Sequence, residues 1–319
     1  MTTIYALTTS SETRKTKKGD DFALAMCRTA EGPIEFKIWD MNNQHPCYPH
    51  KGEILKIDEY QDQREEKFRN ITVKKNGFTK ITKEELPPEL IKVLFYYKKP
   101  SNEQIKTAFA SLLDASYYQS ESNYLWVKEC INSVGVDKFV KCPAAKAVHH
   151  DYYGGLLFHT LEVLNFCRAL ASAMPDKNYI NTDVLCAAAS LHDVGKIFTY
   201  SIDEFGTCGK NVWEDAVGHI YYSMQTVDRI GGVEPWFKDE VLHAIAAHHG
   251  TTDHGTIKVP TSLEAMILSR ADDLSAKCGI VANRLKEPQN PDDDLLDSNM
   301  LKREIYLKTN ALKGILNNP

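Results

Sequence analysis

Apolar and polar residues alternate along the first part of the chain with the period of two that is typical of half-buried β-strands. Phe22, Leu24 and Met26 follow this pattern, and so does the run from Ile34 to Ile38 after a Gly-containing turn. The predicted strands lie at residues 4–9, 22–26, 34–38, 54–57 and 68–73, with turns at residues 31–33 and 61–67. About five strands without a helical period predict a small β-barrel over residues 1–85.

The period changes to that of α-helices at Ser101, which can cap a helix together with Gln104. Residues 86–140 predict a linker and helical lead-in, and residues 141–285 predict an all-α bundle with short connections. The fold class is therefore multidomain, β followed by α. Residues 286–319 predict an acidic loop and a last helix over residues 299–312. The other predicted helices lie at residues 90–96, 124–134, 156–174, 183–192, 212–230, 238–249 and 261–277.

The composition argues against a membrane protein. Of the 319 residues, 43% are hydrophobic and 25% are charged, and no apolar run reaches the length of about 18 residues that a membrane span needs. The eight cysteines form no Cys-x-x-Cys pair and the first residues do not resemble a secretory signal, so we expect reduced thiols and a cytoplasmic location. Residues 1–100 carry 18 basic and 15 acidic side chains, which permits a polyanion-binding first domain without requiring one.

His192 and Asp193 stand side by side at the end of an apolar run. Neighbouring helix residues point about 100° apart, so both reach one ion only where a helix faces the middle of a bundle. A lone buried histidine is more often a satisfied core residue than a ligand, but a series of them at successive helix ends favours a metal site. Burying an unpaired carboxylate on an apolar helix is also costly. The further candidates are His159, His219, His243, His248, His249, Asp272 and, as an alternative to Asp272, Asp273.

The order of these residues is similar to that of the HD-domain phosphohydrolases that bind two metal ions. The series that carries the resemblance is His159, His192-Asp193-Val194-Gly195-Lys196, Gly218-His219, His248-His249-Gly250 and Asp272. Together with the OB-like strands before it, the chain resembles the YhaM-type 3′→5′ exoribonucleases, in which an OB-fold precedes an HD domain.

The resemblance implies a role for each candidate. One metal ion would be bound by His159, His192, Asp193 and Asp272, and a second by His219, His248 and His249, with Asp193 bridging both. Asp193 and Lys196 would be catalytic, and His149, His150 and Lys196 would contact the substrate. Imidazole and carboxylate ligands together suit Mn²⁺ first, with Fe, Co²⁺ and Zn²⁺ as alternatives.

Some of these residues also have a purely structural interpretation. Lys196 could be a solvated lysine at a helix end, and His149 and His150 could be exposed loop histidines. His243 is expected not to bind a metal, because it lies five residues before His248 and therefore well round the helix.

An OB-type barrel implies a surface for single-stranded nucleic acid, where bases stack on aromatic rings within a basic groove. The candidates are Lys17, Lys18, Phe22, Phe36 and Trp39. The alternative is that the aromatic side chains fill the barrel core and the lysines form a solvated turn.

The leading hypothesis is metal-dependent hydrolysis of single-stranded RNA from its 3′ end to nucleoside 5′-monophosphates. Cleavage of single-stranded DNA and assembly into a homo-oligomer are left open. The alternative is an HD-domain phosphodiesterase that acts on a cyclic dinucleotide or another small nucleotide. A nucleic-acid-binding protein with an inactive HD domain is a third hypothesis, which the intact ligand series disfavours.

Overall fold

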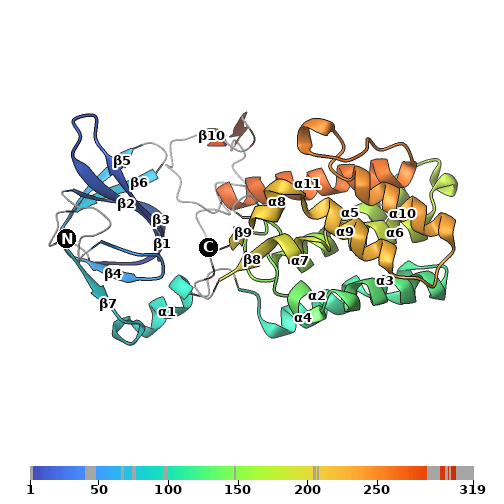
Figure 1. The fold of residues 1–319 in the computed structure, drawn as a ribbon, viewed down its shortest axis with the longest axis horizontal. Coiled ribbons are helices and arrows are strands. Elements are labelled where there is room, and N and C mark those ends of the chain that lie inside the picture. Colours follow the sequence, from blue (N-terminus) through green and yellow to red (C-terminus); the bar gives the residue numbers. More distant parts are fainter. Residues whose placement is uncertain are drawn as a thin grey trace. The chain divides into compact units, whose positions relative to one another are not determined.

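The computed structural model divides into two compact units, residues 1–98 with 203–207 and residues 99–202 with 208–319 (Figure 1). Each unit is described by itself. The structure describes residues 3–39, 48–65, 68–73, 77–95, 99–146, 149–203, 206, 208–285, 295–298, 301 and 303–306.

The first unit is a curled, OB-like half-barrel made of one seven-stranded sheet (Figure 1). The strand order is β5-β6-β3-β2-β1-β4-β7, and every pair is antiparallel except β3 and β6. The strands are β1 (Ile4–Lys15), β2 (Asp21–Thr29), β3 (Gly32–Trp39), β4 (Ile54–Ile57), β5 (Tyr60–Glu65), β6 (Phe68–Val73) and β7 (Phe78–Ile81).

The predicted β-hairpin is confirmed. β2 and β3 pair from Thr29 opposite Gly32 to Phe22 opposite Trp39, and Gly32 has a φ of 115°, which suits glycine at a tight turn. The predicted polar turn at residues 61–67 is wrong where β5 occupies it. β5 is an edge strand, where polar residues can face water, so its sequence lacks the alternation that reveals a half-buried strand.

Two apolar layers hold this unit together. Phe36, predicted to stack on nucleic acid, is fully buried among inward-facing residues of the sheet and meets Phe78 edge to face at a centroid distance of 5.5 Å. It therefore fills the core instead of offering a surface to a base. On a second apolar layer, Leu94 of helix α1 (Pro88–Phe95) packs with Leu7 and Ile54.

The second unit is helical, and its buried core is formed by residues of α2, α3, α4, α5, α6, α9, α10 and α11. The predicted cap of α2 is confirmed, because Ser101 and Gln104 form a reciprocal capping box. The helices are α2 (Asn102–Leu112), α3 (Glu121–Ser133), α4 (Val136–Phe139), α5 (Gly155–Ala173), α6 (Thr182–Leu191), α7 (Lys196–Thr199), α8 (Val212–Ala216), α9 (His219–Arg229), α10 (Pro235–Ala247) and α11 (Leu263–Leu285).

Three features of this unit differ from the prediction. The helix predicted over residues 212–230 is split into α8 and α9, because Gly218 (φ 82°, ψ 153°) adopts a conformation outside the helix. A short hairpin of β8 (Tyr200–Ile202) and β9 (Cys208–Lys210) interrupts the helices. The helix predicted over residues 299–312 is wrong at β11 (Arg303–Tyr306), which pairs with β10 (Leu295–Ser298). The rest of that prediction, apart from residue 301, lies outside the described residues.

Among the described residues, no helix combines the length and the apolar character needed to cross a membrane.

Candidate metal centre

Four side chains from three helical segments meet in the core of the helical unit and form the first cluster, His159, His192, Asp193 and Asp272. His159 lies on α5, Asp272 lies on α11, and His192 and Asp193 directly follow α6. His159 Nε2 lies 3.3 Å from Asp193 Oδ2 and 3.1 Å from Asp272 Oδ1. His192 Nε2 lies 3.3 Å from Asp193 Oδ2 and 3.7 Å from Asp272 Oδ1. Two imidazole nitrogens and two carboxylates thus converge on one point.

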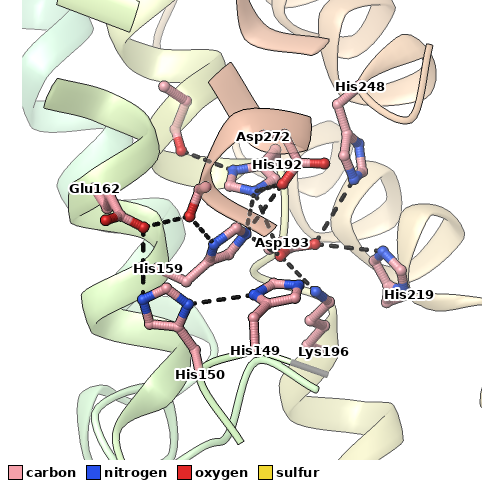
Figure 2. A network of polar contacts seen from close by, with 12 residues as sticks. His149, His150, His159, Glu162, His192, Asp193, Lys196, His219, His248 and Asp272 are labelled. Carbon is pink, nitrogen blue, oxygen red and sulfur yellow. Dashed lines mark hydrogen bonds and ion pairs between the residues drawn. The ribbon is translucent and has the colours of Figure 1, made fainter. Parts of the chain in front are cut away.

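His219, His248 and His249 form a second cluster. Figure 2 shows His219 and His248 on the other side of Asp193 from His159. His219 Nε2 lies 3.3 Å and His248 Nε2 lies 3.7 Å from Asp193 Oδ1, the oxygen that does not face the first cluster. Asp193 therefore divides its two oxygens between the clusters. This is the arrangement that a carboxylate bridging two ions requires.

Backbone carbonyls fix the orientation of one histidine in each cluster. His192 Nδ1 donates to the carbonyl oxygen of Ala189 at 2.9 Å, and His248 Nδ1 donates to that of Ile245 at 2.7 Å. A carbonyl can only accept, so the proton of each ring sits on Nδ1 and the lone pair of Nε2 points into the centre. Metal-binding histidines are typically held in this way.

The donor set fits divalent cations. Asp193 Oδ1, His219 Nε2 and His248 Nε2 are buried and have no hydrogen-bond partner within the part of the chain that the structure describes. Leaving three such atoms unpaired in the core is costly, and a cation shared by their lone pairs removes that cost. The first cluster offers two histidines and two carboxylates, a mixed set that suits Mn²⁺, Fe, Co²⁺ or Zn²⁺.

The charges in the centre keep its carboxylates ionised. Burial by itself raises the pKa of Asp193, but the Lys196 ammonium and the His192 imidazole outweigh it and hold that pKa well below its usual range. The pKa of Asp272 is lowered against the same effect of burial, mainly by hydrogen bonds with His159 and His192. Both carboxylates are therefore in the form that binds cations.

Lys196 lies inside the centre and is buried, so it is not a solvated lysine at a helix end. It is the first residue of α7, and its Nζ lies 2.7 Å from Asp193 Oδ2. The contacts of the ammonium place a fixed positive charge beside the point where the two clusters meet. Its catalytic role stays a prediction.

Gly195 explains how the two clusters come so close, and the sequence analysis gave this residue no role. A Cβ atom at this position would lie 2.3 Å from the carbonyl oxygen of His219 and 2.4 Å from the amide nitrogen of Ser223. The N–H of Gly195 also donates to Ser223 Oγ at 2.9 Å. Only glycine lets the start of α9, and with it His219, pack directly against the segment that carries Asp193.

His149 and His150 lie beside the first cluster, at ring-centroid distances of 5.0 and 5.4 Å from His159. His149 is buried, which lowers the pKa of its imidazole to about 2, so the interpretation as an exposed loop histidine is wrong for this residue. His150 has a positive φ of 47°, and its carbonyl oxygen accepts from the N–H of Ala144. This hydrogen bond ties His150 to Ala144, and substrate contact stays a prediction for both histidines.

Two of the sequence candidates lie outside both clusters. His243 Nε2 accepts from the backbone N–H of Thr261 at 3.2 Å and belongs to neither cluster. Asp273 pairs with Lys277, one turn further along α11, at 2.6 Å. The carboxylate at the centre is therefore Asp272, and Asp273 faces away.

In the first unit, the predicted nucleic-acid residues other than Phe36 lie toward one end of the β1–β2–β3 strands. Phe22 and Trp39 are cross-strand neighbours with ring centroids 5.1 Å apart, and Trp39 is 40% exposed. Lys17 and Lys18 are exposed in the turn between β1 and β2. This arrangement offers an aromatic pair and nearby cations, and its role in binding stays a prediction.

Comparison with known proteins agrees with the resemblance seen in the sequence. Residues 156–277 match the family model described as HD domain, so the helical unit contains an HD domain, which implies binding of divalent metal ions. The chain is similar to the 3'-5' exoribonuclease YhaM of Bacillus licheniformis, with 27% identity over 300 residues that cover 89% of this chain and 87% of the relative. The proteins of the same name from Bacillus subtilis and Listeria monocytogenes are each 26% identical, over 88% and 89% of this chain and 87% of each relative. No solved structure matches the chain.

Proposed function

We propose that the chain is a metal-dependent 3′→5′ exoribonuclease that hydrolyses single-stranded RNA to nucleoside 5′-monophosphates. The observation that carries the proposal is the position of Asp193 between two sets of histidines, 3.3 Å from both His159 and His219. Similarity to exoribonucleases along 89% of the chain supports RNA as the substrate.

In this proposal each residue of the centre has a defined task. His159, His192 and Asp272 would hold one cation, His219, His248 and His249 would hold the other, and Asp193 would contribute to both sites. When bound, two divalent ions supply Lewis acidity at the phosphate and lower the pKa of a water molecule. Mn²⁺ is the ion we propose, because mixed imidazole and carboxylate ligands suit it.

The chain itself supplies the other contacts to the scissile phosphate. Lys196 holds a buried ammonium beside Asp193 and can pair with a non-bridging phosphate oxygen, where charge grows in the transition state. His149 and His150 lie next to the first cluster, where a neutral imidazole can donate a hydrogen bond to a phosphate oxygen or to the leaving oxygen. Lys196 and His149 are buried, and the exclusion of water around them strengthens each electrostatic contact.

The OB-like unit holds the RNA strand upstream of the reacting end in this proposal. The exposed ring of Trp39 and its neighbour Phe22 offer a stacking surface, and Lys17 and Lys18 offer cations to the phosphates. A cytoplasmic location belongs to the same proposal, and the seven cysteines that the structure describes are all free thiols, as expected there.

The test follows the direction of cleavage. RNA oligomers labelled at the 5′ end are incubated with the protein and Mn²⁺, beside matched oligomers with a blocked 3′ end, a DNA oligomer and a cyclic dinucleotide. The proposal predicts a ladder that shortens from the 3′ end, release of nucleoside 5′-monophosphates and protection by the 3′ block. Hydrolysis of the cyclic dinucleotide with intact RNA would move the activity to the alternative, which the comparisons do not favour.

A further inference from the structure

His219 has a carboxylate directly behind it. Its Nδ1 donates to Glu214 Oε1 at 2.7 Å. Its Nε2 points at Asp193, as Figure 2 shows. Glu214 comes from the short helix α8 and is largely buried. The hydroxyl of Tyr200 donates to the same oxygen of Glu214 at 3.3 Å. The imidazole of His219 is thus held between two carboxylates, of which only Asp193 belongs to the ligand series.

His159 is held by a longer chain of contacts. Its Nδ1 donates to Ser275 Oγ at 2.9 Å, and the Ser275 hydroxyl donates to Glu162 Oε2 at 2.5 Å. Since the hydroxyl proton is given to Glu162, Ser275 can only accept from His159, which places the proton of that ring on Nδ1. Ser275 is fully buried, and Glu162 also lies 3.6 Å from His150 Nε2. A neutral hydroxyl therefore stands between the first cluster and the nearest outer carboxylate.

The hydrogen-bond partners that orient His159 and His219 differ in kind from those that orient His192 and His248. His192 and His248 are oriented by backbone carbonyls, which come with the helix ends that carry them. His159 in the first cluster and His219 in the second are instead oriented by side chains, those of Ser275 and Glu214. A hydrogen bond to the far nitrogen fixes the ring and raises its basicity, and an ionised acceptor does so more than a neutral one.

We propose that Glu214 and the Ser275–Glu162 pair are positioning residues that set the metal affinity of one cluster each. Glu214 acts through His219 on the second cluster, and Ser275 with Glu162 acts through His159 on the first. This inference rests on the metal centre of the proposed function and does not depend on the identity of the substrate.

The test is calorimetric titration of the full-length protein with Mn²⁺. Glu214→Gln keeps an oxygen that accepts from His219 but removes the charge, whereas Glu214→Ala removes both. The Glu214 variants are made in a protein that also carries Asp272→Ala, because that substitution disables the first cluster. In this background we expect Mn²⁺ affinity to be highest with Glu214, lower with Gln and lowest with Ala. The loss with Ala should reach about 10–100-fold, as for other outer partners of metal ligands. In a chain whose second cluster is intact, Ser275→Ala should lower the Mn²⁺ affinity of the first cluster by a similar factor.

Glu264→Gln is the matched control. Glu264 is a buried glutamate on α11 that accepts the backbone N–H of Asn181 at 2.7 Å, outside both clusters. Its substitution should leave both Mn²⁺ affinities unchanged, which separates positioning from a general loss of fold. Equal Mn²⁺ affinities for each parent protein and its Glu214 or Ser275 variants would overturn the inference. Because binding is read out, a protein that binds Mn²⁺ without degrading RNA rejects the proposed function alone.

Discussion

The ammonium of Lys196 lies 2.7 Å from Oδ2 of Asp193, the oxygen that also faces the first cluster. Lys196 can therefore bind a substrate phosphate, and it can also compete with a metal cation for Asp193. We expect Lys196→Met to lower the turnover of RNA by about 100-fold, the loss typical of one charge-stabilising donor. Removal of the competing charge should leave Mn²⁺ affinity equal or higher. Initial rates and calorimetry on the same preparation check both expectations, and normal turnover would refute the proposed contact to phosphate.

Gly195 sets how closely α9 approaches Asp193, so its substitution should damage both fold and site. A Cβ at this position would meet backbone atoms of His219 and Ser223 within 2.4 Å. We expect Gly195→Ala to lower the free energy of unfolding by about 1–3 kcal/mol, the typical cost of overpacking, and to weaken the second cluster. Gly231→Ala is the matched control, because a Cβ there meets nothing within 4 Å. Urea unfolding of the two variants should differ clearly, and equal stability would contradict the packing argument.

Asp272 and Asp273 are adjacent carboxylates with opposite surroundings, which gives a sharp test of the ligand assignment. Asp272 faces His159 at 3.1 Å, whereas Asp273 pairs with Lys277 on the surface of α11. Asp272→Ala should remove Mn²⁺ from the first cluster and abolish RNA degradation. Asp273→Ala should change the free energy of unfolding by less than about 1 kcal/mol and leave metal content unchanged. Metal analysis of both proteins decides the assignment, and the reverse pattern would transfer the role to Asp273.

Trp39 and Phe36 lie on the same strand, but substituting them should affect different properties, RNA binding for Trp39 and stability for Phe36. Trp39→Ala removes an exposed stacking surface, so binding of single-stranded RNA should weaken by about tenfold, with little change in stability. Phe36→Ala leaves a cavity in the barrel core and should cost about 3–5 kcal/mol of stability. Fluorescence anisotropy with labelled RNA and thermal unfolding separate the two effects. Unchanged RNA affinity for Trp39→Ala would argue against this surface as the binding site.

The ligand series was predictable because its members are chemically distinctive. Histidines and aspartates on otherwise apolar helices each demand a partner, and the structure brings His159, His192, Asp193 and Asp272 within reach of one another. The alternating strands and the cap at Ser101 were predictable for another reason, because each depends on the spacing of residues close together in the sequence.

The outer partners of the histidines were not predictable from spacing. Ser275 and Glu162 are ordinary helix residues, and only the packing of α5 against α11 joins them to His159. Glu214 meets His219 because Gly218 breaks the helix between them, a break hidden within a continuous amphipathic pattern. The edge strand β5 was not predicted from the sequence, because a strand exposed to water needs no apolar face.

The central claim is that Asp193 serves two cations at once in an enzyme that shortens RNA from the 3′ end. The most direct measurement is the metal content of the wild-type protein and of Asp193→Asn, together with degradation of 5′-labelled single-stranded RNA in Mn²⁺. Asparagine keeps the shape of the side chain but cannot bridge two cations as a carboxylate does. The account predicts about two ions per chain and a ladder shortening from the 3′ end for the wild type, with fewer ions and no ladder for the variant. Full metal content and normal RNA degradation in Asp193→Asn would contradict it.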